Sequence, residues 1–209
     1  MNPKFFGLSP ERQDLIRNSA MVEFGEGGFK KTSADAIAKR AGVSKALLFH
    51  YFKDKRELYL YLFQHAVDQC MDVFNKHILK AADLGETDFF QTLEAGHKLK
   101  MDMVRRHPGL FRFVMRAYYE RDGALSPKLR GKLDDVLERS TAEFLSRMDL
   151  CKFKDGVNPR EVVRLLTLAS EGLLAETGAY TAEEIDRLFA EYKKYADMLR
   201  RHLYKEEYL

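Results

Sequence analysis

Residues 32–52 of this 209-residue chain read TSADAIAKRAGVSKALLFHYF. Two short helices joined by a tight turn fit this stretch, because Gly42 suits the left-handed backbone conformation that such a turn requires. We expect Thr32 to cap the first helix, with Asp35 completing a capping box, and Ser44 to cap the second. The pattern is typical of a helix-turn-helix.

The apolar side chains of these two helices can pack against each other and against a helix over residues 10–25, which leaves one face of the second helix outward. That face carries one cation, small apolar groups and polar aromatic rings. Such a surface suits the major groove of DNA better than plain solvent, which would favour more Glu and Lys. The residues expected on it are Lys45, Ala46, Leu47, Phe49, His50 and Tyr51.

Positive charge is concentrated in the same region. The whole chain has a formal charge of +3, yet residues 30–56 hold eight Lys and Arg against two Asp. This excess indicates a polyanionic partner. The alternative is an ordinary solvated basic face.

The rest of the chain has helical periodicity. Its composition and its short apolar runs predict a soluble protein without a membrane span. The first residues lack the pattern of a secretion signal, and two cysteines are too few for a disulfide framework or a zinc site, so we expect a reduced, cytoplasmic protein. Caps and breaks predict an all-α fold of about nine helices, over residues 10–25, 32–41, 44–51, 57–79, 88–106, 108–122, 126–150, 159–178 and 182–203.

Residues 10–60 resemble the TetR family of bacterial transcriptional repressors. The resemblance lies in the glycine-rich turn 25–28, in Thr32-Ser33 and Ile37-Ala38, and in the strings AGVSK over 41–45 and LFHYFK over 48–53. It implies a three-helix DNA-binding domain over residues 1–53 and a helical effector-binding and dimerisation domain over residues 54–209. It also implies a homodimer, a palindromic double-stranded operator and a small, usually apolar effector.

Candidate DNA contacts combine the resemblance with residue chemistry. Ser33 resembles a phosphate contact at a helix N-terminus, and Lys45 is the candidate for reading guanine. The family often has Gly or Pro and then Thr where this chain has Ala46-Leu47, so the hydrogen bond of the threonine hydroxyl is absent here. Leu47 could instead touch a thymine methyl group. The full candidate set is Ser33, Ser44, Lys45, Ala46, Leu47, Phe49, His50, Tyr51 and Lys55, the last as a phosphate contact. For Ser33 and Ser44 the alternative is simple capping, and for Phe49 it is packing against the first helix.

The second half shows no catalytic constellation, phosphate loop or metal-ligand spacing, so we expect no enzyme activity, metal or cofactor there. Met and aromatic side chains at helical spacing suit an adaptable ligand cavity, although most of them must belong to the core. The candidates are Phe90, His97, Met101, Phe111, Met115, Tyr118, Tyr119 and Phe144. Glu120, Glu171 or Glu176 could pair with a cationic ligand, or be ordinary surface acids.

Apolar stripes on the last two helices predict a dimer interface formed by Val162, Leu166, Ala169, Leu173, Ile185, Phe189 and Tyr192. The alternative is that both stripes are buried against the chain's own core. Together these features predict a dimeric repressor released from its operator by a small, apolar effector. Two alternatives are a similar DNA-binding regulator without an effector (an activator or a partner-controlled protein) and, more remotely, a helical enzyme.

Overall fold

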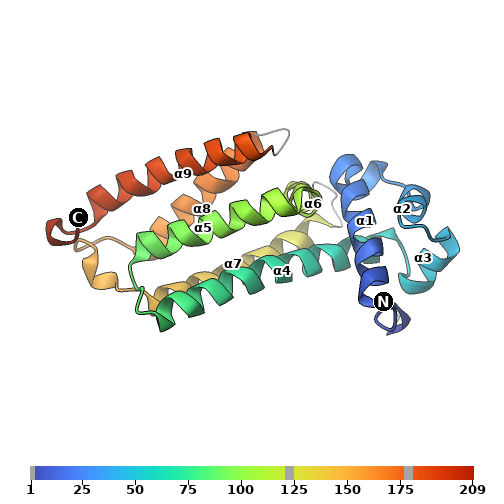
Figure 1. Ribbon diagram of the computed structural model, residues 1–209, viewed down its shortest axis with the longest axis horizontal. Helices are drawn as coiled ribbons and strands as arrows, with labels where there is room; N and C mark the ends of the chain where they lie inside the picture. Colours follow the sequence, from blue (N-terminus) through green and yellow to red (C-terminus); the bar gives the residue numbers. More distant parts are fainter. Residues whose placement is uncertain (1–2, 121–124, 177–180) are drawn as a thin grey trace. The chain divides into compact units, whose positions relative to one another are not determined.

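The computed structural model describes residues 3–120, 125–176 and 181–209 of the chain. Over these residues the fold is all-α, with no strand (Figure 1). The helices are α1 (Pro10–Lys31), α2 (Ala34–Arg40), α3 (Lys45–Tyr51), α4 (Lys55–Asp83), α5 (Phe89–Arg106), α6 (Pro108–Tyr118), α7 (Ser126–Arg147), α8 (Pro159–Glu176) and α9 (Ala182–Leu203). Three 3₁₀ turns are η1 (Pro3–Phe5), η2 (Leu150–Lys152) and η3 (Glu206–Tyr208).

The chain divides into two compact units that are not consecutive in sequence. The first unit contains residues 1–69 and 107–134, and the second contains residues 70–106 and 135–209. The two consecutive domains predicted from the sequence, 1–53 and 54–209, therefore group the helices differently. In the structure the beginning of α4, all of α6 and the beginning of α7 belong with α1–α3.

Side-chain caps explain most helix starts. Ser9 caps α1, and Thr181 forms a full capping box with Glu184 at the start of α9. At the start of α4, the Asp54 carboxylate accepts the backbone N–H of Glu57 at 2.7 Å. The predicted cap at Thr32 is wrong, because Ser33 caps α2 and the Thr32 hydroxyl instead donates to the Glu23 carbonyl.

Two glycines take the left-handed conformation where the first unit needs it. Gly42 (φ 62°) forms the turn between α2 and α3, as the sequence predicts. Gly28 (φ 69°) kinks α1. The kink brings the backbone against the guanidinium of Arg116, and a Cβ at position 28 would lie 2.9 Å from its Nε. The helix continues beyond the predicted stop at 25–28, to Lys31.

Aromatic packing builds the core of the first unit. The ring of Tyr59 on α4 lies 4.8 Å from that of Phe24 on α1 and 5.1 Å from that of Phe113 on α6. A Cβ at Gly25 would lie 3.3 Å from the backbone nitrogen of Phe113, so the two helices approach closely there. Helix α6 thus completes the core that α1 and α4 form.

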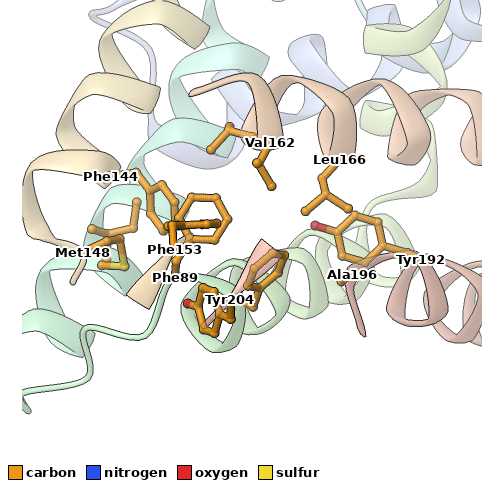
Figure 2. Packing of buried hydrophobic residues seen from close by; sticks show 12 residues of the cluster. Phe89, Phe144, Met148, Phe153, Val162, Leu166, Tyr192, Ala196 and Tyr204 are labelled. Carbon is orange, nitrogen blue, oxygen red and sulfur yellow. The ribbon is translucent and has the colours of Figure 1, made fainter. Parts of the chain in front are cut away.

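The core of the second unit joins α4, α5, α7, α8 and α9. Figure 2 shows Phe89, Phe144 and Phe153 facing one another, with Tyr204 beside them. The rings of Phe89 and Phe153 lie 5.0 Å apart. An antiparallel bridge between Phe153 and Tyr204 joins the segment after α9 to the segment before α8.

Apart from the end of α1, the helix ends agree with the predicted ranges to within four residues where they can be compared. The predicted turn at Asp122-Gly123 and the predicted helix end at Gly178 lie outside the described residues. Among the helices described, none combines the length and the apolar character that crossing a membrane requires.

Candidate nucleic-acid interface

Helix α3 presents one exposed face to its surroundings. Lys45, Ala46, Phe49 and His50 are exposed, and we call these four residues the α3 surface. Their spacing places them on one side of a helix, because positions one, four and five residues apart share a face. Leu48 on the opposite side is buried in the first unit, which fixes the orientation of α3.

Lys45 is held by a weak ion pair. Its ammonium donates to the carboxylate of Asp35 on α2 at 2.8 Å, and both side chains are more than half exposed. Exposed ion pairs contribute roughly 0–1 kcal/mol, so a phosphate or a guanine edge can replace Asp35 at little cost. The pair places the cation at the N-terminal end of α3, which is the end that enters the groove in helix-turn-helix proteins.

Ser33 and Ser44 both act as helix caps. Their hydroxyl oxygens accept the backbone N–H groups of Ala36 and Leu47, each at 3.1 Å. Both serines therefore cap their helices. Capping uses a lone pair of the hydroxyl oxygen and leaves the O–H free to donate to a phosphate, so the two roles are compatible.

Two of the candidate contacts are positioned for structural roles. Tyr51 was expected to face outward, yet it is 8% exposed and its ring lies 5.9 Å from that of Phe5. Lys55 donates to the carbonyls of Phe29 and Thr32 at 2.7 and 2.9 Å. These carbonyls lie at the end of α1, where a helix lacks internal partners. Lys55 thus caps α1 with two of its three N–H donors. Leu47 is half-buried.

Comparison with known proteins agrees with this architecture. Residues 16–62, which run from α1 through α3 into α4, match the family model described as bacterial regulatory proteins, tetR family. Residues 16–62 therefore belong to the TetR family. The fold of the chain is similar to that of the transcriptional regulator FadR from Bacillus subtilis, whose crystal structure in complex with stearoyl-CoA matches with a TM-score of 0.66 and 17% identity over 89% of this chain and 96% of that one.

Among relatives in sequence, the HTH-type transcriptional activator FasR of Mycolicibacterium smegmatis is 28% identical over 131 residues, which are 63% of this chain and 56% of FasR. The nucleoid occlusion factor SlmA of Aliivibrio fischeri is 27% identical over 151 residues, 70% of this chain and 71% of SlmA. The chain thus aligns with little more than half of FasR. A regulator from Mesorhizobium loti gives a TM-score of 0.68 at 16% identity, covering 93% of this chain and 98% of that one.

The candidate effector residues fall into two groups. Phe90, His97, Met101 and Phe144 belong to the second unit, whereas Phe111, Met115, Tyr118 and Tyr119 lie on or next to α6 in the first unit. Phe90 and Phe144 are buried in the aromatic core of the second unit. Tyr119 is half exposed.

His97 lies in a polar cluster that sequence reasoning did not find. Its ring stacks on that of Tyr192 with the centroids 3.6 Å apart. Its Nδ1 lies 3.4 Å from the hydroxyl of Ser170, which in turn accepts a hydrogen bond from Lys100 at 3.2 Å. Burial lowers the pKa of His97 to about 3, and the positive charge of Lys100 adds to the effect. The available signal was the spacing of three between His97 and Lys100, which puts both on one side of α5.

The predicted dimer residues lie mostly inside the chain. Val162, Leu166, Ile185 and Tyr192 are buried in the second unit, which corresponds to the alternative of burial against the chain's own core. Ala169, Leu173 and Phe189 are half-buried. The exposed apolar and small residues of α8 form a different stripe, consisting of Leu165, Leu168, Gly172 and Ala175, with Tyr195 and Met198 exposed on α9. We call the α8 positions the outer stripe.

Proposed function

We propose that this TetR-family regulator binds a palindromic operator as a homodimer through α3, and that a small, apolar effector releases it. The α3 surface carries this proposal. It is an exposed, short helix face with a lysine whose present partner is easily displaced. The caps Ser33 and Ser44 add hydroxyl donors at two neighbouring helix N-termini, which suits phosphate binding.

A dimer is proposed because one short recognition helix buries too little surface for tight, specific binding. Twofold symmetry would present two copies of α3 to two half-sites about 34–36 Å apart, or a multiple of that distance. The outer stripe supports this association. Leu165 and Leu168 are 52% and 53% exposed, and the small residues Gly172 and Ala175 continue the stripe along the same side of α8.

Release by an effector is supported by the course of α4. This helix starts shortly after α3, and its residues from Cys70 onward belong to the second unit. A ligand that favours one position of α4 would change the spacing of the two recognition helices. The FadR structure contains stearoyl-CoA, so a ligand-binding regulator has this fold.

A regulator without an effector is the second candidate, because the relative FasR is described as an activator. The two candidates differ in linkage. If an effector releases the operator, operator DNA must weaken effector binding by the same factor. A coupling of about 1–3 kcal/mol would be usual for such a switch.

The test is fluorescence anisotropy with labelled DNA from upstream of the chain's own gene, titrated at several salt concentrations. We expect binding that is stronger than to a scrambled duplex of equal length. Equal affinity for both duplexes would contradict sequence-specific regulation from this site. A ligand that binds the protein with the same affinity whether or not operator is present would favour the second candidate.

A further inference from the structure

Asp35 is an acidic residue inside the basic segment of the chain. Residues 30–56 hold eight Lys and Arg and two acidic residues, Asp35 and Asp54. Asp54 caps α4, whereas α2 is capped by Ser33, so the cap of α2 does not require Asp35. The Asp35 carboxylate instead accepts a hydrogen bond from the ammonium of Lys45 at 2.8 Å. An acid thus lies beside the lysine that is the candidate for reading guanine.

The fold keeps this carboxylate near the ammonium. Helices α2 and α3 pack against each other (Figure 1), and their residues Ile37 and Leu48 are buried in the first unit. In the turn between the helices, the backbone N–H of Gly42 donates to the Lys39 carbonyl at 3.2 Å. The ion pair itself is exposed, but the backbones that carry it are fixed by this packing. A competing anion can displace the Asp35 carboxylate from the ammonium, and the carboxylate still stays close by.

A phosphate and a guanine edge meet this ion pair differently. A phosphate is an anion, so at Lys45 it lies close to the negative charge of Asp35, and like charges repel. The O6 and N7 atoms of guanine are uncharged acceptors. An ammonium has three N–H donors, so Lys45 can bind guanine and keep its hydrogen bond to Asp35. The pair therefore favours a base contact over a phosphate contact by the same cation.

We propose that Asp35 is a specificity-determining residue, which disfavours phosphate contacts by Lys45 and so lowers the affinity for DNA that lacks the operator sequence. This role rests on the proposed function, since it requires that α3 binds DNA. Phosphate contacts supply essentially all of the affinity of a DNA-binding protein for unrelated sequences. Asp35 thus raises the ratio of operator affinity to non-specific affinity, rather than the operator affinity itself.

The test compares the parent protein with Asp35→Asn by fluorescence anisotropy, using the duplex from upstream of the gene and its scrambled version at several salt concentrations. We expect the affinity for the scrambled duplex to rise at least about threefold, and the affinity for the upstream duplex to change less. The salt dependence of scrambled-duplex binding should steepen by about one for each Lys45 that then contacts a phosphate. Asp14→Asn is the matched control, because it removes the same charge from an exposed carboxylate paired with Arg17 on α1 and should leave the affinity ratio unchanged.

Removing the lysine shows whether Asp35 acts through it. In a Lys45→Ala background, Asp35→Asn should no longer raise the affinity for the scrambled duplex. A negative charge in the first turn of α2 also stabilises that helix through its dipole, and urea unfolding of each variant records this contribution separately.

Two results would overturn the proposal. The first is an affinity ratio that is unchanged in Asp35→Asn, and the second is a rise in scrambled-duplex affinity that persists in the Lys45→Ala background. With either result, a parent protein that prefers the upstream duplex keeps the proposed function. A parent protein that binds both duplexes equally would contradict the proposed function itself, and this role of Asp35 with it.

Discussion

Lys45 and Lys55 are both cations near α3, yet their surroundings give them different roles. The Lys45 ammonium contacts the exposed carboxylate of Asp35, a partner that water and phosphate can readily replace. The Lys55 ammonium contacts two backbone carbonyls at the end of α1 and lies 4.7 Å from the centroid of the Phe29 ring. A residue's type and charge are thus insufficient to assign a DNA contact, because the partners within the fold decide whether the charge is available.

Lys45→Ala is expected to weaken specific binding and to relax the preference at one base pair in each half-site. A bidentate contact to guanine contributes about 1–3 kcal/mol of discrimination, which the variant would lose. Anisotropy with operator variants at that base pair measures the effect. If Lys45→Ala lowers the affinity for all sequences equally, Lys45 contacts phosphate.

Lys55→Met is expected to destabilise the first unit by about 1–3 kcal/mol, because two charge-assisted hydrogen bonds to helix-end carbonyls are lost. Urea unfolding followed by circular dichroism measures the free energy of unfolding. Lys53→Met, at an exposed lysine two positions earlier, is the control and should unfold like the parent protein. A smaller salt dependence of DNA binding in Lys55→Met, with unchanged stability, would restore the phosphate contact expected from the sequence.

Among the elements, α5 shows how a helix holds a titratable group in one state. Its His97 is stacked on Tyr192 and hydrogen-bonded to Ser170, so the neutral ring is the form that fits. Burial lowers the pKa of His97 from 6.5 to about 3 in the folded chain. The unfolded chain therefore takes up a proton at a higher pH than the folded chain does.

The free energy of unfolding should consequently fall as the pH falls from about 6.5 toward 3. Above pH 6.5 His97 is neutral in both the folded and the unfolded chain, so its full contribution to stability is present there. The slope from this one group is at most about 1.4 kcal/mol per pH unit. Urea unfolding at a series of pH values, compared between the parent protein and His97→Gln, isolates the contribution. His202→Gln, at an exposed histidine on α9, is the control. Parallel pH curves for the parent and His97→Gln would contradict the assignment.

Elements were predictable from the sequence where their causes are local. Ser9, Ser44 and Thr181 cap the helices expected of them, and Gly42 forms the expected turn. Thr32 failed as a cap because its hydroxyl finds a carbonyl on α1, nine residues back. Which side of a helix is buried depends on distant segments in the same way. The sequence around Tyr51 does not indicate that Phe5 of η1 packs against its ring.

At the scale of the whole molecule, the proposed dimer interface depends on which apolar surface stays exposed after the chain folds. Helix α8 has apolar residues on two sides. Val162 and Leu166 are enclosed by the core of the second unit, whereas Leu165 and Leu168 are left exposed. Helical periodicity locates both sets of apolar residues, but it does not show which set is buried. That is decided by α5 and α9, which pack against one side of α8.

Leu168→Asp is expected to give a folded monomer, because this side chain is exposed in the single chain and an unpaired charge within an interface costs several kcal/mol. Sedimentation velocity measures the oligomeric state, and operator affinity should fall with it. Leu84→Asp, at an exposed leucine just after α4, is the control and should remain dimeric. A Leu168→Asp dimer would move the interface away from the outer stripe.

The interrupted course of the first unit through the sequence affects how this regulator can be re-engineered. At Gly25 and Gly28 the backbone of α1 closely approaches α6, more than eighty residues later in the sequence. Gly25 lies against the Phe113 backbone and Gly28 against the Arg116 guanidinium. A chimera that exchanges residues 1–53 alone for those of another repressor would set a foreign α1 against the native α6. Grafts intended to change operator choice should therefore either replace α3 residues only or carry α6 with the transplanted segment.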